Sequence, residues 1–371
     1  MKPPLFIHIG THKTGSTAIQ RALKAGEGAC LNEGLVRLTC DEFLARPKWS
    51  QKDREELVDW LRRQLNKHEG KSRRFLLSSE GFSGDPMTGY ADASTIASRL
   101  REVTRDFDVS IIVFLRRQDD FIESLYTQKI HEGWSKTFQE FLEEIRPEAM
   151  NWHRLLESYA REFGRENIIA RRYHRDYYPN TEDLIVDFCG MVGMTPEALK
   201  GRLKTVRNQG FSMEAVELAR LCNPCLNGDL RKRLRNLLQV ISAKPVFQSY
   251  TYLDLQARQQ LLAAHEGANA RVQREYMREQ NGEPLFPGPE ELPAVARTAE
   301  GEALSVVLVK MLLERKKAED RSGILRFVMR MERRWNQFRE SWVRPKAGGV
   351  AKLKDREQLP DRKANMRKAR V

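Results

Sequence analysis

Residues 5–20 read LFIHIGTHKTGSTAIQ, and the fold follows from this stretch. Its first five residues are largely apolar and predict a short buried strand. Glycine and hydroxyl residues then form a turn, after which Ile19 and Leu23, four residues apart, begin a helical pattern. A helix N-terminus carries backbone N–H groups without intrahelical partners and the positive end of the helix dipole. A strand that leads through such a turn into a helix therefore predicts a phosphate-binding loop.

The spacing within the loop narrows the class of phosphate-binding protein. A nucleotide-binding P-loop reads G-x-x-x-x-G-K-[ST], and Gly10, Gly15 and Thr17 fit this pattern. The lysine position of the pattern holds Ser16, and the loop carries its lysine at position 13. A magnesium-dependent kinase would need that lysine at position 16. The displaced lysine therefore argues against a kinase.

Composition sets the broad class of the protein. With 371 residues and 40% apolar residues, the chain can form one large or two modest domains. No apolar run reaches the roughly 18 residues of a membrane span, and the first residues do not resemble a signal peptide. The five cysteines are odd in number and sparse, so the sequence predicts no disulfide framework. We expect a cytoplasmic protein in a reducing compartment.

The charge is strongly positive and unevenly distributed. The formal net charge is +13 and the pI is near 9.6, which favours anionic ligands or surfaces. About half of the excess lies in residues 341–371, where ten Lys or Arg stand against three Asp or Glu. This tail is either a solvated basic segment or a contact for acidic partners.

Strands alternate with helices along the first half of the chain. The predicted strands are 5–9, 35–38, 75–79, 109–115 and 167–173. The predicted helices are 51–69, 92–105, 119–131, 136–145, 151–163 and 181–193, the last capped by Asn180 or Thr181. This alternation predicts an α/β fold, a P-loop NTPase-like parallel sheet flanked by helices.

The second half of the chain is predicted to be helical. Beyond about residue 195 no strand is predicted, and helical patterns cover 212–222, 228–240, 252–264 and 268–279. The proline-rich segment 281–289 closes a predicted α/β domain of residues 1–290. A helical extension follows in 291–342, with helices at 302–317 and 323–342. We expect the basic tail 343–371 to be disordered.

An aromatic stripe marks the predicted helix 323–342. Trp335, Phe338 and Trp342 recur at helical spacing and are flanked by arginines. The stripe either packs on the protein itself or a second subunit, or lets residues 323–371 dock on an anionic membrane surface or a protein partner. The protein can thus be peripheral to a membrane. Nucleic acid is not an expected partner, because no recognised binding module is present, and the oligomeric state stays open.

The loop resembles that of sulfotransferases that use 3′-phosphoadenosine 5′-phosphosulfate (PAPS). In that family the loop after the first strand typically reads Lys-[Ser/Thr]-Gly-[Thr/Ser]-[Thr/Ser], and residues 13–17 read Lys-Thr-Gly-Ser-Thr. The match is closest to bacterial members with a K-T-G-S-T loop. The resemblance implies that the loop binds the 5′-phosphosulfate of the donor and that Lys13 helps the sulfuryl group to leave. The donor-binding residues implied in the loop are His12, Lys13, Thr14, Gly15, Ser16, Thr17 and Ala18.

A second motif of that family follows the predicted strand 109–115. The family places an Arg, then an Asp four residues on and a Ser eight residues on, around the 3′-phosphate; Arg116, Asp120 and Ser124 keep this spacing. The resemblance implies that Arg116 and Ser124 bind the 3′-phosphate. The family's Asn-Pro is replaced here by Arg117-Gln118, so Arg116 and Arg117 both stay open as the phosphate ligand.

The acceptor of the sulfuryl group needs a base. Glu80 ends a predicted strand on the side where open α/β sheets bind ligands, and the family has a glutamate base in a similar segment. His12 is the alternative base, and His131 is expected at the surface. A metal is not expected, because a sulfuryl group carries less charge than a phosphoryl group and backbone donors with one lysine can stabilise the leaving oxygen.

Two other motifs carry weaker signals. Arg207–Gly210 stands where some family members cover the 3′-phosphate with a basic loop, but a polar turn is the preferred interpretation. Cys222 and Cys225 lack a second pair of ligands, so neither a zinc site nor a redox site is predicted.

These observations predict a PAPS-dependent sulfotransferase. It would move a sulfuryl group from PAPS to a hydroxyl, or less readily an amine, of an acceptor. Resemblance to bacterial glycan-modifying members favours a carbohydrate acceptor. The alternatives are a P-loop nucleotide kinase and a non-catalytic binding protein of the same fold that docks through its basic tail.

Overall fold

The computed structural model describes residues 2–39, 49–68, 73–199, 210–241, 243–244, 250, 252–277, 282–289, 330–331 and 334–335. The chain forms two units, Met1–Met311 and Leu312–Val371, and the features below belong to the first. None of the helices in these residues is long and apolar enough to cross a bilayer. The predicted domain boundary near residue 290, the helix 302–317, most of the helix 323–342 and the basic tail lie outside the described residues.

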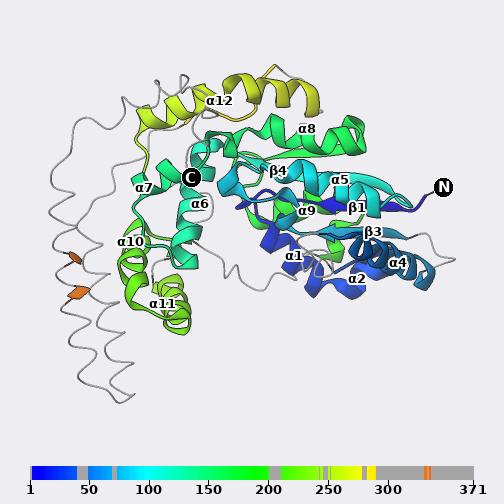
Figure 1. Cartoon of the computed structure of the whole chain (residues 1–371), viewed down its shortest axis with the longest axis horizontal. Coiled ribbons are helices and arrows are strands. Elements are labelled where there is room, and N and C mark those ends of the chain that lie inside the picture. The colour runs from blue at the N-terminus through cyan, green and yellow to red at the C-terminus, as the bar shows by residue number, and fades with distance from the viewer. Residues whose placement is uncertain are drawn as a thin grey trace, which may run out of the picture. The chain divides into compact units, whose positions relative to one another are not determined.

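A parallel five-stranded sheet forms the centre of the first unit (Figure 1). Its strand order is β2-β3-β1-β4-β5, and each pairing is parallel. The strands are β1 (Pro4–His8), β2 (Leu35–Arg37), β3 (Arg74–Ser78), β4 (Asp108–Arg116) and β5 (Ile168–Tyr173). The predicted α/β fold, a P-loop NTPase-like parallel sheet flanked by helices, is confirmed, as are all of its predicted strands.

The central strands are apolar on both faces because helices cover both. Ile111 to Leu115 of β4 are completely buried, which is typical of a parallel sheet between two helical layers. Side chains alternate along a strand, so Ile112 and Phe114 point to one face and Ile111 to the other. Since Ile112 pairs with His8 of β1, His8 points to the same face as Phe114, whose ring its own ring meets edge-on.

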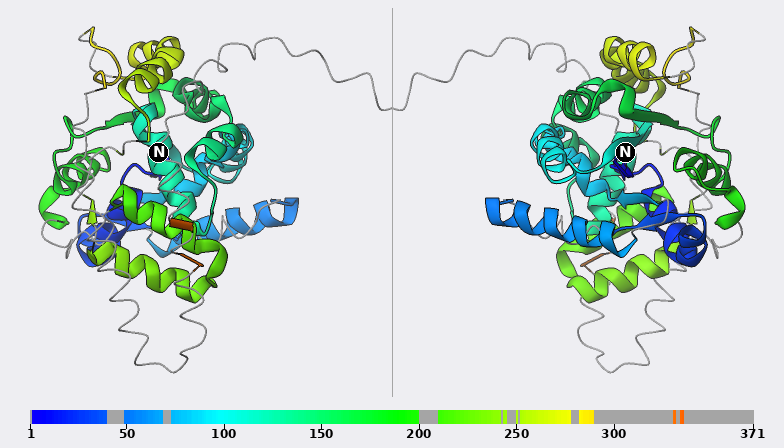
Figure 2. Two further views of the ribbon diagram at one scale, coloured as in Figure 1. Left: turned by 90° about the vertical axis from the view of Figure 1, so that its left-hand side faces the viewer. Right: turned by 90° about the vertical axis from the view of Figure 1, so that its right-hand side faces the viewer.

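One helical layer consists of α1 (Ser16–Ala25), α2 (Glu27–Asn32) and α9 (Thr181–Met191), and the other contains α5 (Ala93–Val103) and α8 (Trp152–Phe163). Figure 2 looks along the strands and shows the two layers on either side. Ile19 of α1 and Phe188 of α9 share a core cluster with Phe114. Asn180 caps α9 through its side chain, as predicted. The helix α4 (Gln51–Lys67) contacts α5.

A further group of helices lies beyond the carboxyl ends of the strands (Figure 1). It comprises α6 (Gln118–Glu132), α7 (Phe138–Glu144), α10 (Met213–Cys222) and α11 (Gly228–Ile241). Unlike a surface helix, α6 is buried on nearly all sides between Gln118 and Thr127. Its polar side chains therefore need partners inside the protein.

Two predictions for the second half of the chain are wrong. The predicted helices 252–264 and 268–279 form one helix, α12 (Leu255–Tyr276). Gly267 does not interrupt it, because a helical glycine costs only about 1 kcal/mol and buried residues such as Arg258 and Val272 anchor both sides. The absence of strands beyond 195 is also wrong: β6 (Gly210–Phe211) and β7 (Ala243–Lys244) pair antiparallel. Strands of two residues are too short to show a periodic pattern.

An ionic cluster joins α12 to α6. Arg258 is 1% exposed and binds Asp119 at 2.6 Å and Glu123 at 2.7 Å. Arg117 binds both carboxylate oxygens of Asp119, at 2.7 and 2.9 Å, and donates to the carbonyl oxygen of Gly288 at 3.0 Å. Burial raises the pKa of Glu123 to about 7, although Arg258 opposes the shift. The cluster fixes α12 and the segment 282–289 against the start of α6.

We predict that Arg258→Met lowers the free energy of unfolding by about 3–5 kcal/mol at pH 7.5, because it leaves Asp119 and Glu123 buried without this cation. The loss should be smaller at pH 5, where protonation of the Glu123 carboxylate, whose pKa burial raises to about 7, removes its charge. Chemical denaturation at both pH values measures it. Arg274→Met, on the same helix but with a side chain 66% exposed, is the control and should change stability by less than about 0.5 kcal/mol. Equal losses in the two variants would contradict the role of the cluster.

Candidate functional site

The loop between β1 and α1 turns by means of three residues in the left-handed region. They are Gly10 (φ +63°), Lys13 (φ +66°) and Gly15 (φ +82°). The loop is closed internally, because the Thr14 hydroxyl donates to the carbonyl oxygen of Thr11 at 2.7 Å and accepts from the Thr11 N–H at 3.3 Å. The strand, turn and helix predicted for residues 5–20 are thus all present.

Two contacts fasten the loop to β4. The hydroxyl of Thr11 donates to the carbonyl oxygen of Phe114 at 2.9 Å. The guanidinium of Arg116 donates to the carbonyl oxygen of Lys13 at 2.9 Å and to the hydroxyl of Ser124 at 3.1 Å. Arg116, Lys13 and Ser124, which the sequence places in two separate motifs, therefore meet in one site at the carboxyl end of the sheet.

The start of α1 offers hydrogen-bond donors to a ligand. Within the described residues the N–H groups of Ser16 and Thr17 have no acceptor, whereas the N–H of Ala18 already donates to the carbonyl oxygen of Gly15 at 2.8 Å. The buried hydroxyl of Ser16 also lacks a partner in this part of the chain. A Cβ at Gly10 would lie 2.7 Å from that hydroxyl, so glycine keeps the space open. These groups fit an anionic oxygen group.

The charge around the loop is positive. Burial, together with the charges of Arg116 and Arg235, lowers the pKa of Lys13 to about 8. Arg116 itself lies over the ring of Tyr173, at 5.8 Å from the ring centre. Burial and the charges of these two arginines destabilise the charged form of Lys13, and an anion would relieve this repulsion.

The structure separates the roles of Arg116 and Arg117. Arg116 points to the loop and to Ser124, while Arg117 is 5% exposed and is held by Asp119 and Gly288 in the ionic cluster. Asp120, the third residue of the predicted motif, lies 3.6 Å from Arg117 and 3.8 Å from Arg258. Only Arg116 of the two arginines therefore lies beside the loop.

Glu80 lies next to the loop, directly after β3. It begins the 3₁₀ turn Glu80–Ser83, which Ser79 caps by accepting the N–H of Gly81 at 3.2 Å. Gln20 of α1 donates to the Glu80 carboxylate at 3.1 Å. A Cβ at Gly10 would also lie 3.4 Å from the Cβ of Glu80, which puts this side chain at the loop itself.

One of the two histidines of the site differs from the sequence prediction. His131 is not a surface residue: it is half-buried, and burial with the charges of Lys13 and Arg235 lowers its pKa to about 3. Burial also lowers the pKa of His12, although Glu80 opposes the shift. The Nδ1 atom of His12 is buried and has no partner in the described residues.

The site thus includes residues that the sequence did not single out. Arg235 lies on α11, more than a hundred residues from the loop in sequence, and no motif marks it. Its position depends on how α11 packs, which local patterns do not reveal. Residues 207–209 of the predicted basic loop lie outside the described residues, and Cys222 and Cys225 are not joined in a disulfide.

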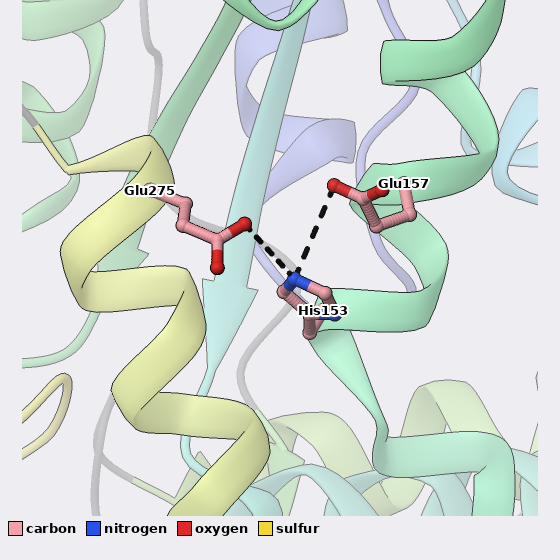
Figure 3. A group of neighbouring side chains, drawn as sticks. All are labelled: His153, Glu157 and Glu275. Atoms are coloured by element: carbon pink, nitrogen blue, oxygen red, sulfur yellow. Dashed lines mark hydrogen bonds and ion pairs between the residues drawn. The ribbon is translucent and has the colours of Figure 1, made fainter.

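A second cluster consists of side chains of the types that bind metal ions, and it lies at the C-terminal end of α12, away from Arg258. Figure 3 shows His153 and Glu157 of α8 facing Glu275 of α12, with 3.2 Å between His153 and Glu275. Arg165 already supplies a cation here, at 2.9 Å from Glu157 and 3.2 Å from Glu275. We interpret this cluster as an ionic link between the two helices.

Comparison with known proteins gives distant matches. No family model matches the chain. An uncharacterised protein from Archaeoglobus fulgidus is 25% identical over 174 residues, which cover 46% of this chain and 46% of that protein. The chain thus matches less than half the length of this relative.

Two solved structures are similar to parts of the chain. One is a sulfotransferase from Alicyclobacillus acidocaldarius, with 16% identity, a TM-score of 0.37, and coverage of 63% of this chain and 100% of that structure. The other is the sulfotransferase domain of the Synechococcus olefin synthase, with 14% identity, a TM-score of 0.34, and coverage of 71% and 95% respectively. At these scores neither structure assigns an activity to this chain.

We predict that Gly15→Ala destabilises the protein by about 2 kcal/mol, because the residue has φ +82° and its new Cβ would lie 2.5 Å from Leu184 and 3.1 Å from Tyr173. Gly28→Ala is the matched control, since nothing lies within 4 Å of its Cβ and it sits in α2, where alanine is the better helix former. Thermal unfolding of the two variants distinguishes them. A neutral effect at position 15 would contradict the close packing of the loop.

Proposed function

We propose that this protein is a PAPS-dependent sulfotransferase that sulfates a hydroxyl group of an acceptor. The observation that carries the proposal is the loop at the start of α1. Within the described residues its N–H groups at Ser16 and Thr17 have no acceptor, and they follow Lys13, whose carbonyl oxygen accepts a hydrogen bond from Arg116, itself bonded to Ser124. This is the arrangement that the resemblance of the two sequence motifs implies for a phosphosulfate on one side and a 3′-phosphate on the other.

The loop would hold the 5′-phosphosulfate end of the donor. The N–H groups of Ser16 and Thr17 and the hydroxyl of Ser16 supply donors, and the dipole of α1 adds positive potential. Arg116 and Ser124 would bind the 3′-phosphate, with Arg116 still anchored to the Lys13 carbonyl. The hydroxyl of Thr14 closes the loop and would contribute to its shape.

Lys13 would stabilise the charge that develops as the sulfuryl group leaves. When bound, the donor supplies an activated sulfuryl group, which passes to the acceptor oxygen as the bond from sulfur to the bridging phosphate oxygen breaks. A preorganised cation at this oxygen lowers the barrier in a site shielded from water. Because its pKa is about 8, Lys13 carries this charge at neutral pH.

Glu80 would accept the proton of the acceptor hydroxyl. Its carboxylate lies beside the loop, and the hydrogen bond from Gln20 fixes its orientation. His12 is the alternative base, since its pKa is lowered and the neutral ring can take a proton. The carbohydrate nature of the acceptor rests on the family resemblance.

The buried position of Asp120 disfavours a magnesium-dependent kinase. Asp120 lies against Arg117 and Arg258, so it is not free to bind a metal beside the loop. Ser16 in place of the P-loop lysine points the same way. Docking of residues 323–371 on an anionic surface stays a prediction, because most of this segment lies outside the described residues.

We predict that adenosine 3′,5′-bisphosphate binds the full-length protein without magnesium, as measured by calorimetry. Lys13→Ala and Arg116→Ala should each weaken binding by about tenfold or more, because each removes a charge-assisted contact to phosphate. Lys24→Ala, an exposed lysine at the end of α1, is the control. The absence of binding to the unmodified protein would overturn the proposed function.

The affinity should depend on pH through Lys13. Its pKa near 8 means that the cation is lost as pH rises from 7 to 9, while the phosphates have already ionised near pH 6. Affinity should therefore fall across this range. Lys13→Arg keeps the charge and should remove the decrease. A decrease that persists in Lys13→Arg would show that another group titrates.

We predict that Glu80→Gln lowers the rate of sulfuryl transfer by about 10²–10⁴-fold, because glutamine cannot take the proton. Transfer from labelled PAPS to an accepted hydroxyl measures the rate, and binding of adenosine 3′,5′-bisphosphate should persist. His12→Gln tests the alternative base. A full rate in Glu80→Gln with loss in His12→Gln would reassign the role to His12.

A further inference from the structure

The helix α11 brings a dense run of positive charge toward the site. Residues 231–235 read Arg-Lys-Arg-Leu-Arg. Leu234 and Leu238 are buried and fix which side of the helix packs on the protein. Arg231 and Arg235 are four residues apart and therefore share one face, which we call the α11 arginine face.

The α11 arginine face is turned toward the end of α6. The guanidinium of Arg231 lies directly against Gly133, which ends α6 with φ +112°, and it occupies the space that a Cβ there would need. Glycine is favoured at this position for two reasons: it adopts the left-handed conformation that ends α6, and it leaves room for the guanidinium of Arg231. Arg235 lies one helical turn further along the same face.

Arg235 lies within electrostatic reach of the reaction centre. Its charge contributes to the lowered pKa values of both Lys13 and His131, after burial. His131 and Ser124 are seven residues apart on α6, or roughly 10 Å along the helix. Arg235 therefore acts near the C-terminal end of α6, whereas Ser124 lies in the middle of this helix, and the charges of Arg116 and Arg235 both act on Lys13.

Arg235 is available to a ligand. Its side chain is exposed, and among the described residues no carboxylate forms an ion pair with it. The carboxylate of Glu132, the last residue of α6, accepts hydrogen bonds from Lys129 at 2.9 Å and from Gln128 at 2.9 Å. The charge of Arg235 acts on Lys13, and among the described residues no carboxylate forms an ion pair with either side chain, so an anion is favoured at that place.

Resting on the proposed function, we infer that the acceptor carries an anionic group, a carboxylate or a sulfate ester, and that Arg235 binds this group while the hydroxyl lies at Lys13 and Glu80. The Arg116–Ser124 pair is assigned to the donor, which leaves the α11 end of the site for the acceptor. Arginine suits a planar carboxylate or a sulfate because its fork of donors can bind two oxygens at once.

The test compares matched acceptors in the full-length protein. The probes are uronate-containing oligosaccharides and the same oligosaccharides with their carboxylates methyl-esterified, each assayed with labelled PAPS. The unmodified protein should prefer the carboxylate form by about tenfold or more in kcat/KM, and Arg235→Ala should bring this ratio close to one through a higher KM for the carboxylate form. Arg235→Lys should restore part of the preference. Arg233→Ala, an exposed arginine two residues away on a different side of α11, is the matched control.

Three results would overturn the inference. The first is a preference of the unmodified protein for the esters, or no acceptance of any uronate probe. The second is an unchanged ratio in Arg235→Ala. The third is a loss of adenosine 3′,5′-bisphosphate affinity in Arg235→Ala as large as that in Lys13→Ala, which would assign Arg235 to the donor. Failure of the unmodified protein to bind adenosine 3′,5′-bisphosphate would instead overturn the proposed function, so the two failures are distinguishable.

Discussion

The guanidinium of Arg116 donates to the carbonyl oxygen of Lys13 and to the hydroxyl of Ser124, and in doing so joins the loop, the end of β4 and the helix α6. The indole N–H of Trp152 in turn donates to the carbonyl oxygen of Arg116 at 2.9 Å, which holds the end of the strand in place. The shape of the loop therefore depends on a side chain from a distant strand, and not on its own residues alone. Any ligand that binds Arg116 also acts on the loop backbone.

The helix α6 carries opposite charge environments at its two ends. Near its start Asp119, Asp120 and Glu123 face Arg117 and Arg258, and the carboxylates in the first turn also suit the helix dipole. Toward its end His131 is kept neutral beside Lys13 and Arg235. The start of α6 is thus charge-paired and fixed to α12, while the charges acting near its end, those of Lys13 and Arg235, have no ion pair within the part of the chain that the structure describes. This contrast separates the part of the helix that is held by ion pairs from the part that borders the candidate site.

Local sequence patterns predicted the sheet and most of the loop. The strand, the glycines and the helix start of residues 5–20 are close in sequence. Arg116 ends a strand and Ser124 follows eight residues later, about two turns into the next helix, so their spacing alone relates them. The choice between Arg116 and Arg117 could not be made in this way, since it depends on Asp119 and on Gly288 from a distant segment.

Features that arise from packing between distant segments were not predicted. Half-burial of His131 follows from the packing of α6 among its neighbours, and the position of Arg235 follows from the contact of Arg231 with Gly133. The continuous helix α12 was predicted as two helices, and it continues through Gly267 because residues on either side, such as Arg258 and Val272, are buried against the rest of the protein. Contacts between segments that are distant in sequence decide each of these cases, and local sequence patterns do not report such contacts.

The two flanks of the loop come from different parts of the chain. Arg116 is hydrogen-bonded to Ser124 and to the loop within the first 132 residues, while Arg235 belongs to α11, whose Arg231 lies against Gly133 at the end of α6. A substitution on the exposed side of α11 leaves every hydrogen bond around Arg116 in place. The two sides of the site can therefore diverge independently in evolution, with new surface chemistry on α11 arising beside an unchanged loop.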